Sequence, residues 1–458
     1  MDAQKQEQRS YWRWSKQDFF PEESFVSFAS YRTALSQTFP RLRDRILYRS
    51  TQSKELVELK KESENDMKRC LNWWDLMWLC FGSVVGSGIF VITGQEAHDH
   101  AGPAIVLSYA VSGLSALLSA FCYTEFAVEI PVAGASGVFA AAAIVYWSYT
   151  GFDMVATMAE ETKKPSRDIP IGLAGSMTVI TVIYCLMALA LTMMQKYTKI
   201  DRNASYSVAF SRIGMKWAKY VVSICALKGM TTSLLVGALG QARYMTQIAR
   251  AHMIPPWFAL VHPKTGTPIN ATLLITVLSA VVAFFSSLDV LSSVLSFSTL
   301  FIFMLMAIAF LVRRYYVKGE TPKSDLHKFL VYLFVIVASC IGGTAVWGTN
   351  TGGWIGYVVA VIFWFLGTLG MQLLPQRRAP QLWGIPLVPY LPSLSIGMNV
   401  FLIGSLGAEA FWRFFICTAV MILYYFLVGL HATYDVAHHI AQESKVKEGK
   451  ENVDRGLS

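Results

Sequence analysis

The chain has 458 residues, of which 54% are hydrophobic and only 15% are charged, and its mean hydropathy is +0.43. Because soluble domains carry about 25% charged residues, this composition excludes an ordinary soluble protein and indicates one with several membrane spans. The net charge of +9 is not evidence of nucleic-acid binding, since most Lys and Arg residues lie in tails and loops, as the positive-inside rule expects.

Residues 1–71 form a basic tail, which we expect to be cytosolic and mostly soluble. Its first 20 residues contain no apolar signal-peptide segment, so we expect the first membrane helix to direct insertion. Two interpretations stay open, a disordered tail with one short helix or a segment on the membrane surface. The second is suggested by aromatic residues that alternate with charges: Tyr11, Trp12, Trp14, Phe19 and Phe20.

Eleven apolar segments within residues 72–435 predict membrane-spanning helices, and the one at 393–407 is short for a span. We therefore expect an all-α polytopic transmembrane domain, followed by a polar cytosolic tail at 436–458. The predicted spans are 74–94, 102–123, 138–160, 171–194, 217–242, 270–288, 290–312, 329–346, 353–374, 393–407 and 411–430.

A glycine-rich stretch at 81–90 interrupts the first predicted span, with Gly82, Gly86 and Gly88 among small serines. A glycine inside a helix costs about 1 kcal/mol relative to alanine, and a bilayer offers freed backbone groups no water. Gly82 and Gly86 form a GxxxG pair, which suits close helix packing alone. We favour a broken helix that binds a ligand with its backbone. A P-loop and a dinucleotide fingerprint are excluded, because the stretch has neither GK[ST] nor a third correctly spaced glycine.

The third predicted span is also interrupted, by Ser148, Thr150, Gly151 and Asp153 in its middle, and it ends in a dense charged boundary at 160–168. Discontinuous helices mark the binding sites of many transporters, so a second broken helix is our preferred interpretation. A tilted, unbroken helix with one interior aspartate is the alternative.

Four separated motifs carry a family resemblance. They are Gly-Ser-Val-Val-Gly-Ser-Gly-Ile-Phe at 82–90; Cys-Tyr-Thr-Glu-Phe at 122–126 with Ile-Pro-Val-Ala-Gly at 130–134; the block at 146–170; and Gln-Ala-Arg-Tyr at 241–244 with Ile-Pro-Pro at 254–256 and His-Pro-Lys-Thr-Gly-Thr-Pro at 262–268. With these motifs the chain resembles the amino acid–polyamine–organocation transporters, and closely the plant cationic amino acid transporters. The resemblance implies an inverted repeat of five plus five helices, within fourteen helices in this group.

The resemblance also points to a deletion at 136–137. In the family, the segment around Gly134 leads into a third, fourth and fifth helix, whereas here it runs directly into the block at 146–170. Splicing or a gene-model omission would explain three missing helices. Because three is odd, the downstream helices would invert, which the positive-inside rule opposes. We expect one segment near the junction, 102–123 or 138–160, to span poorly, and glycosylation at Asn203 to report the retained orientation.

Two broken helices that meet near the membrane midplane would form an amino-acid site from backbone groups. A half-helix N-terminus binds a carboxylate, and unwound carbonyls accept hydrogen bonds from an ammonium group. The expected carboxylate contacts are Ser87, Gly88 and Ile89, and the expected ammonium contacts are Val84, Val85, Tyr149 and Thr150, with Gly151 in the same unwound stretch.

Side chains near the two motifs are candidates for closing the site. By resemblance, Trp147 would close over the substrate, with lipid or core packing as its alternative role. Asp153 and Glu125 are the acids nearest the two motifs and could contact a cationic side chain, although a structural or gating role is favoured for each.

Lys228 lies in the middle of the predicted span at 217–242, where a charge suggests a function. It could occupy a cation-like position or take part in proton coupling, and a structural hydrogen bond to backbone carbonyls is the alternative. A cytosolic gate latch is suggested by five charged residues, with a solvated loop as the alternative: Glu160, Glu161, Lys163, Lys164 and Arg167. By resemblance, Arg243 would end a helix near the inner mouth.

Transport of cationic amino acids such as arginine, lysine and histidine, by alternating access, is the function that the resemblance implies. Its drive would be protons or the membrane potential. The alternative is a transport-inactive product that binds full-length transporters or is degraded. We expect no enzyme activity, cofactor, metal or nucleic-acid partner, and the histidines at 431–439 suit a juxtamembrane helix better than a metal site. The expected partners are the substrate and the lipid bilayer, with protons and a second copy of the chain left open. The plasma membrane is the expected location, with vacuolar or endomembrane placement open.

Overall fold

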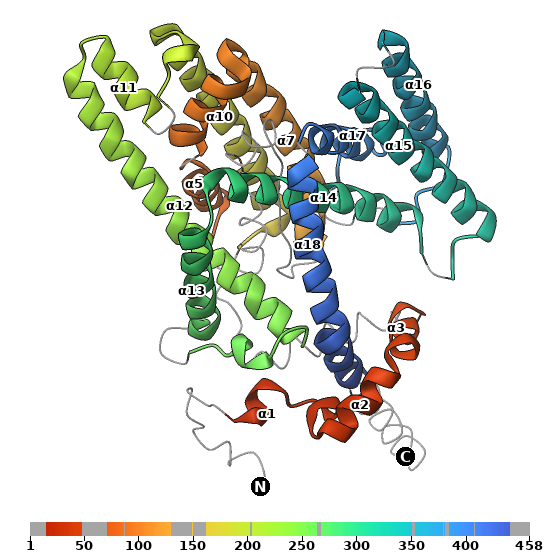
Figure 1. Cartoon of the computed structure of the whole chain (residues 1–458). Helices are drawn as coiled ribbons and strands as arrows, with labels where there is room; N and C mark the ends of the chain where they lie inside the picture. The colour runs from red at the N-terminus through yellow and green to blue at the C-terminus, as the bar shows by residue number, and fades with distance from the viewer. Residues whose placement is uncertain are drawn as a thin grey trace, which may run out of the picture. The chain divides into compact units, whose positions relative to one another are not determined.

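The structure is a computed structural model, and it describes residues 15–47, 71–86, 88–129, 149, 162–201, 204–262, 267–317, 319–349, 353–378, 380, 384–406 and 408–439. The chain divides into two compact units, whose helices are labelled in Figure 1. The core unit comprises residues 67–240 and 282–414. The terminal unit comprises residues 1–66, 241–281 and 415–458.

The described residues of the core unit are helical, apart from connecting turns and one isolated bridge between Leu71 and Thr162. Its main helices are α5 (Trp73–Val84), η3 (Gly88–Ile92), α6 (Thr93–Glu96), α7 (Ile105–Glu129), α10 (Pro165–Met194), α11 (Ser205–Arg212), most of α12 (Lys216–Arg250), α14 (Leu288–Tyr315), α15 (Lys323–Thr349), α16 (Gly353–Gln372), α17 (Tyr390–Gly404) and the start of α18 (Ala408–Tyr424). The all-α polytopic fold expected from composition is thereby confirmed.

Among the described residues, seven helices are long and apolar enough to cross a membrane. An eighth candidate is a bent pair, Trp73–Val84 with Gly88–Glu96, and two further apolar helices are shorter, α13 (Ile269–Phe285) and α17. Each of these corresponds to one of the predicted spans. Of the remaining predicted span, at 138–160, the structure describes only Tyr149, so the count of eleven stays a prediction.

The start of α5 is determined by its first residues. The Asn72 side chain accepts hydrogen bonds from the backbone N–H groups of Trp74 and Asp75, at 2.9 and 3.1 Å, and Asp75 accepts one from the Asn72 N–H at 3.0 Å. This capping box satisfies N–H groups that a helix start leaves unpaired. Lys163 N–H donates to the Leu71 carbonyl at 2.8 Å, so the starts of α5 and α10 lie together.

Small residues allow the core helices to approach one another. A Cβ at Gly172 of α10 would lie 3.0 Å from Leu76 Cβ and 3.2 Å from the Trp73 carbonyl of α5. Helices α7 and α17 are joined by a buried polar cluster, in which Ser115 donates to Asn399 at 3.3 Å and Asn399 donates to Ser119 at 3.4 Å. Such bonds satisfy side chains that lipid would leave without partners.

The terminal unit brings the N-terminal segment 15–47 onto two later parts of the chain. Its helices are α1 (Lys16–Phe19), α2 (Phe28–Ser36) and α3 (Thr38–Leu47). Phe19 stacks on Trp257, with ring centroids 5.0 Å apart, and His252 Nδ1 lies 2.6 Å from a carboxylate oxygen of the buried Glu22. Both later residues follow α12, so the described part of the tail is a docked helical segment.

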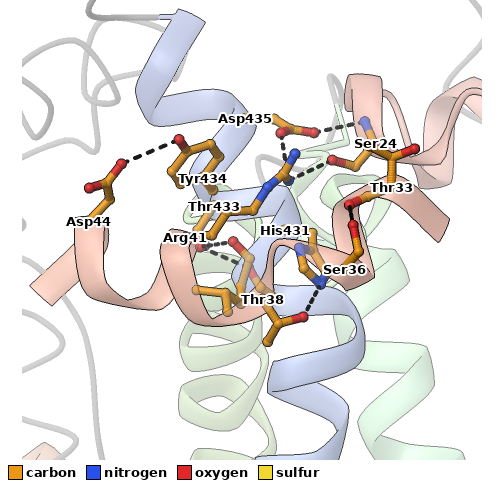
Figure 2. Close-up of polar contacts among 12 residues, drawn as sticks. Ser24, Thr33, Ser36, Thr38, Arg41, Asp44, His431, Thr433, Tyr434 and Asp435 are labelled. Atoms are coloured by element: carbon orange, nitrogen blue, oxygen red, sulfur yellow. Dashed lines mark hydrogen bonds and ion pairs between the residues drawn. The ribbon is translucent and has the colours of Figure 1, made fainter. Parts of the chain in front are cut away.

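The other attachment of this segment is the helical stretch 430–439, which follows η9 (Tyr425–Gly429) and is shown in Figure 2. The Asp435 carboxylate accepts from the Ser24 N–H at 2.8 Å and from the Arg41 guanidinium at 3.1 Å. Arg41 also donates to Ser24 Oγ at 2.8 Å and lies over the Tyr434 ring at 4.7 Å. We call these four residues the Asp435 network.

We predict that Asp435→Ala releases the segment at 22–45. The substitution leaves the mostly buried Arg41 and the Ser24 N–H without their acceptor, at a cost of about 2 kcal/mol, so the amides of α2 and α3 should exchange about thirtyfold faster by hydrogen-exchange mass spectrometry. Glu409→Ala is the matched control, because it removes a carboxylate that is 82% exposed and paired with Arg413. Equal exchange in the two variants would contradict the prediction.

Candidate functional site

The glycine-rich stretch breaks the first span, as its composition predicts. Helix α5 ends at Val84, and Val85 is extended, with φ −76° and ψ 94°. The chain resumes as the π-helix η3 at Gly88, and the two helical pieces are bent by 40°. A break of this kind leaves the carbonyls at the end of α5 without intrahelical donors.

Hydroxyl groups from two neighbouring helices bind the carbonyls on the α5 side of the break. Tyr184 of α10 donates to the Val84 carbonyl at 2.9 Å. Ser233 of α12 lies within hydrogen-bond distance of two carbonyls, Gly82 at 3.2 Å and Val85 at 3.3 Å. The break is therefore satisfied by protein donors, as a bilayer requires.

On the η3 side the partners are also hydroxyls. Tyr109 of α7 donates to the Gly88 carbonyl at 3.3 Å. Thr93 donates to the Ile89 carbonyl at 2.5 Å, and its hydroxyl lies 2.6 Å from that of Tyr109. Ser205 of α11 donates to the Phe90 carbonyl at 3.3 Å.

Tyr149 lies in the same buried group of rings, although it comes from the second predicted break. Its hydroxyl donates to the Tyr109 carbonyl at 3.0 Å, and its ring centroid is 5.1 Å from that of Tyr184 and 6.3 Å from that of Tyr109. All three tyrosines are fully buried. The structure thus brings this residue of the 146–170 block to the break in the first span.

The glycines of the break also permit close packing against α12. A Cβ at Gly86 would lie 2.9 Å from Ser233 Cβ and closer still to its hydroxyl, and one at Gly82 would lie 3.3 Å from Thr232. From the other side, a Cβ at Gly229 would lie 3.3 Å from the Val85 carbonyl. The two interpretations of these glycines, packing and a broken helix, therefore hold together at one place.

The expected substrate contacts fall into two groups. Val84, Gly88 and Ile89 are buried at the break and Val85 is half-buried there. The remaining expected contacts, apart from Tyr149, lie outside the described residues: Ser87, Trp147, Thr150, Gly151 and Asp153. The structure therefore describes the first half of the expected site and one residue of the second.

The gating and coupling candidates lie on α7 or α12, around the start of α10, or outside the described residues. Lys228 is exposed on α12, whereas the next residue, Gly229, faces the break. Arg243 is half-buried on α12 within the terminal unit, and Glu125 lies on α7 in a stretch whose side chains are not described. Glu160, Glu161 and Asn203 lie outside the described residues. In the parts of the chain that the structure describes, no group of three His, Cys, Asp or Glu residues could hold a metal ion.

Five residues of the site were missed by sequence reasoning: Tyr109, Tyr184, Ser233, Ser205 and Thr93. Thr93 alone had a local signal, because it follows Ile89 by four residues and so reaches its carbonyl along the same helix. The other four depend on which faces of α7, α10, α11 and α12 meet the break, and this is set by tertiary packing.

We predict that Gly86→Ala destabilises the break by about 1–3 kcal/mol, because the added methyl group displaces Ser233 from the Gly82 and Val85 carbonyls. Thermal unfolding of the purified protein in detergent measures this change. Gly237→Ala on α12 is the matched control, since its Cβ would meet no atom within 4 Å, and it should be neutral or slightly stabilising. A Gly86→Ala variant as stable as this control would show that Ser233 does not constrain the break.

Comparison with known proteins shows that the site lies in a sequence shared with a protein family. A family model described as amino acid permease matches residues 71–143 and 130–371, and one described as the C-terminus of the same permease matches 383–433. In Arabidopsis thaliana, the chain is 55% identical to cationic amino acid transporter 8, vacuolar, over 96% of each chain. It is 54% identical to cationic amino acid transporter 5, over 94% of this chain and 98% of the relative.

A third relative from the same plant, cationic amino acid transporter 1, is 45% identical over 97% of each chain. These matches cover the broken helix, the helices that donate to it and the membrane spans that follow. They confirm the expected resemblance, and they identify a membrane transporter and not an enzyme. The chain belongs to the amino acid permease family and is similar to its plant cationic amino acid transporters.

Proposed function

We propose that this chain transports cationic amino acids, such as arginine, lysine and histidine, by alternating access, with the substrate bound at the break between α5 and η3. The observation that carries the proposal is a buried break whose carbonyls are held by hydroxyls from α10 and α12. The names of the three relatives support the substrate class.

The break offers both kinds of group that an α-amino acid needs. The first N–H groups of η3, at Gly88 and Ile89, begin a helical piece that runs to Glu96, and a helix start favours a carboxylate. The carbonyls of Val84 and Val85 accept from hydroxyls, but a carbonyl oxygen has two lone pairs. A substrate ammonium would therefore share these oxygens with Tyr184 and Ser233, or displace the two hydroxyls.

For the driving force we propose protons or the membrane potential, since one charge crossing 100 mV gains about 2.3 kcal/mol. Lys228 and Glu125 are the proposed coupling or gating residues of the spans, and Glu160, Glu161 and Arg243 are the proposed residues of the inner gate. Trp147 and Asp153 remain proposed substrate contacts. The plasma membrane stays the proposed location, although one relative is named vacuolar and another chloroplastic.

A second candidate function is a transport-inactive product that binds full-length transporters or is degraded. It is favoured by the alignment to cationic amino acid transporter 8, which has 565 positions, whereas this chain has 458 residues. At least 107 positions of the alignment (565 − 458) therefore have no residue in this chain. The family model also matches in two segments, 71–143 and 130–371, which meet around residues 136–137. Both observations support the proposed loss of three helices at that junction.

We predict that radiolabelled arginine uptake in a transport-deficient host separates the two candidates. The transport proposal expects uptake above the empty host, with competition by lysine and histidine. The comparison is a chain in which three helices of a relative are restored after Ser136, with equal amounts of protein in the membrane. Uptake by the restored chain alone would favour the second candidate.

A related prediction concerns Lys228 and is tested in the restored chain. Lys228→Met removes a charge from the middle of α12, one residue from a glycine that contacts the break. If Lys228 takes part in coupling, arginine uptake should fall and should no longer depend on external pH. Lys219→Met, also exposed and nearer the start of the same helix, is the control. Unchanged uptake with unchanged pH dependence would remove Lys228 from the mechanism.

A further inference from the structure

Among the residues that the structure describes, the docked N-terminal segment has one face that no other part covers. Phe28 at the start of α2 is 82% exposed, and Phe39 on α3 is 84% exposed. Each phenylalanine is followed four residues later by an exposed arginine, Arg32 and Arg43 respectively. Residues four apart lie one above the other on a helix, so each helix presents a phenylalanine–arginine pair outward.

The opposite face of the same segment is attached to a membrane helix. Tyr31, on α2, donates its hydroxyl to the Leu427 carbonyl at 3.1 Å. On α3, Arg41 forms an ion pair with Asp435 at 3.1 Å (Figure 2). Both acceptors belong to the apolar helical stretch Ala408–His439, which is long enough to cross a membrane.

The depth of this attachment follows from helix geometry. Arg413 is the last Lys, Arg, Asp or Glu residue before Asp435, which lies about 33 Å further along the helix at 1.5 Å per residue, and the hydrocarbon core is about 30 Å thick. The Asp435 end of the attachment therefore lies at the boundary between hydrocarbon and headgroups. An exposed phenylalanine gains free energy by leaving water at this boundary, whereas it gains none in bulk water.

We propose that α2 and α3 bind the phosphate headgroups of anionic lipids at the C-terminal end of α18. Phe28 and Phe39 enter the headgroup boundary, and Arg32 and Arg43 bind the lipid phosphates with their planar guanidinium groups. Residues 26–45 contain four arginines and one aspartate, and Arg41 already has a carboxylate partner. The remaining positive charge matches an anionic leaflet, which is the cytosolic one under the placement proposed for both tails.

Hydrogen-exchange mass spectrometry on the full chain in nanodiscs tests this binding. One preparation contains phosphatidylcholine alone, and the other contains phosphatidylcholine mixed with phosphatidylserine. The amides of 28–45 should exchange at least about fivefold more slowly in the mixed lipid, since each bound arginine contributes roughly that factor. The difference should disappear at high salt, which screens the attraction.

Two variants separate the lipid contacts from the fold of the segment. In Arg32→Glu/Arg43→Glu the effect of phosphatidylserine should be lost, and in Phe28→Ser/Phe39→Ser exchange should be faster in both lipids. Both change only exposed side chains, so the Asp435 network stays intact. The matched control is Lys196→Glu/Lys199→Glu, which reverses two exposed charges of the core unit and should keep the lipid effect.

Exchange that is equal in the two lipids for the unaltered chain would overturn the proposal without any variant. Protection that appears only in nanodiscs holding two chains, with or without phosphatidylserine, would also overturn it, because the uncovered face would then bind a second copy of the chain. Neither result bears on transport, which the uptake experiment measures separately.

Discussion

Carbonyl groups freed inside a bilayer must find donors within the protein, and the core unit depends on this constraint. Breaking the first span at Val85 and Gly86 frees carbonyls on both sides of the break. Tyr184 and Ser233 bind those of α5, and Tyr109 and Thr93 bind those of η3. Since three of these donors come from other helices, α7, α10 and α12 must each bring one particular face to the break.

The need to bring a donor from α12 to the break explains the glycines better than helix packing or helix breaking does alone. Ser233 can reach two carbonyls of α5 only if α12 approaches closely, and Gly82, Gly86 and Gly229 provide the space. A glycine that packs and a glycine that breaks a helix are here consequences of the same contact. Under the proposed function, the same contact would also let a substrate bind, because a hydroxyl that binds a carbonyl can share it with an incoming ammonium group.

The sequence was informative where the signal was local and silent where it depended on packing. The break at 81–90 could be predicted because glycine is unfavourable inside a helix, and the spans because apolar length is directly visible. Tyr109 and Tyr184 lie in apolar stretches with nothing nearby to distinguish them from core residues. The position of Lys228 in the middle of a predicted span could be read from the sequence, but not that its side chain is exposed on α12 while the adjacent Gly229 faces the break.

The N-terminal tail shows the same difference between local features, which the sequence reveals, and distant contacts, which it does not. Its basic and aromatic composition left a disordered chain and a surface segment equally open, because composition does not reveal a distant partner. Glu22 contacts His252, and Arg41 pairs with Asp435, although more than two hundred residues of sequence separate each pair. Contacts at such separation have no local signature, and they convert part of a polar tail into a docked pair of helices.

The proposed deletion would affect the backbone groups of the transport site less than the surroundings of the substrate side chain. Among the described residues, the donors that hold the break belong to η3's own continuation and to α7, α10, α11 and α12, all of which the chain retains. The helices proposed to be missing would come between α7 and the 146–170 block, where they would form other walls of the site. Backbone geometry for the amino and carboxylate groups can therefore persist while the surroundings of the substrate side chain are incomplete. A chain of this kind should retain recognition of the α-amino acid group more readily than selectivity for a cationic side chain, and binding more readily than alternating access.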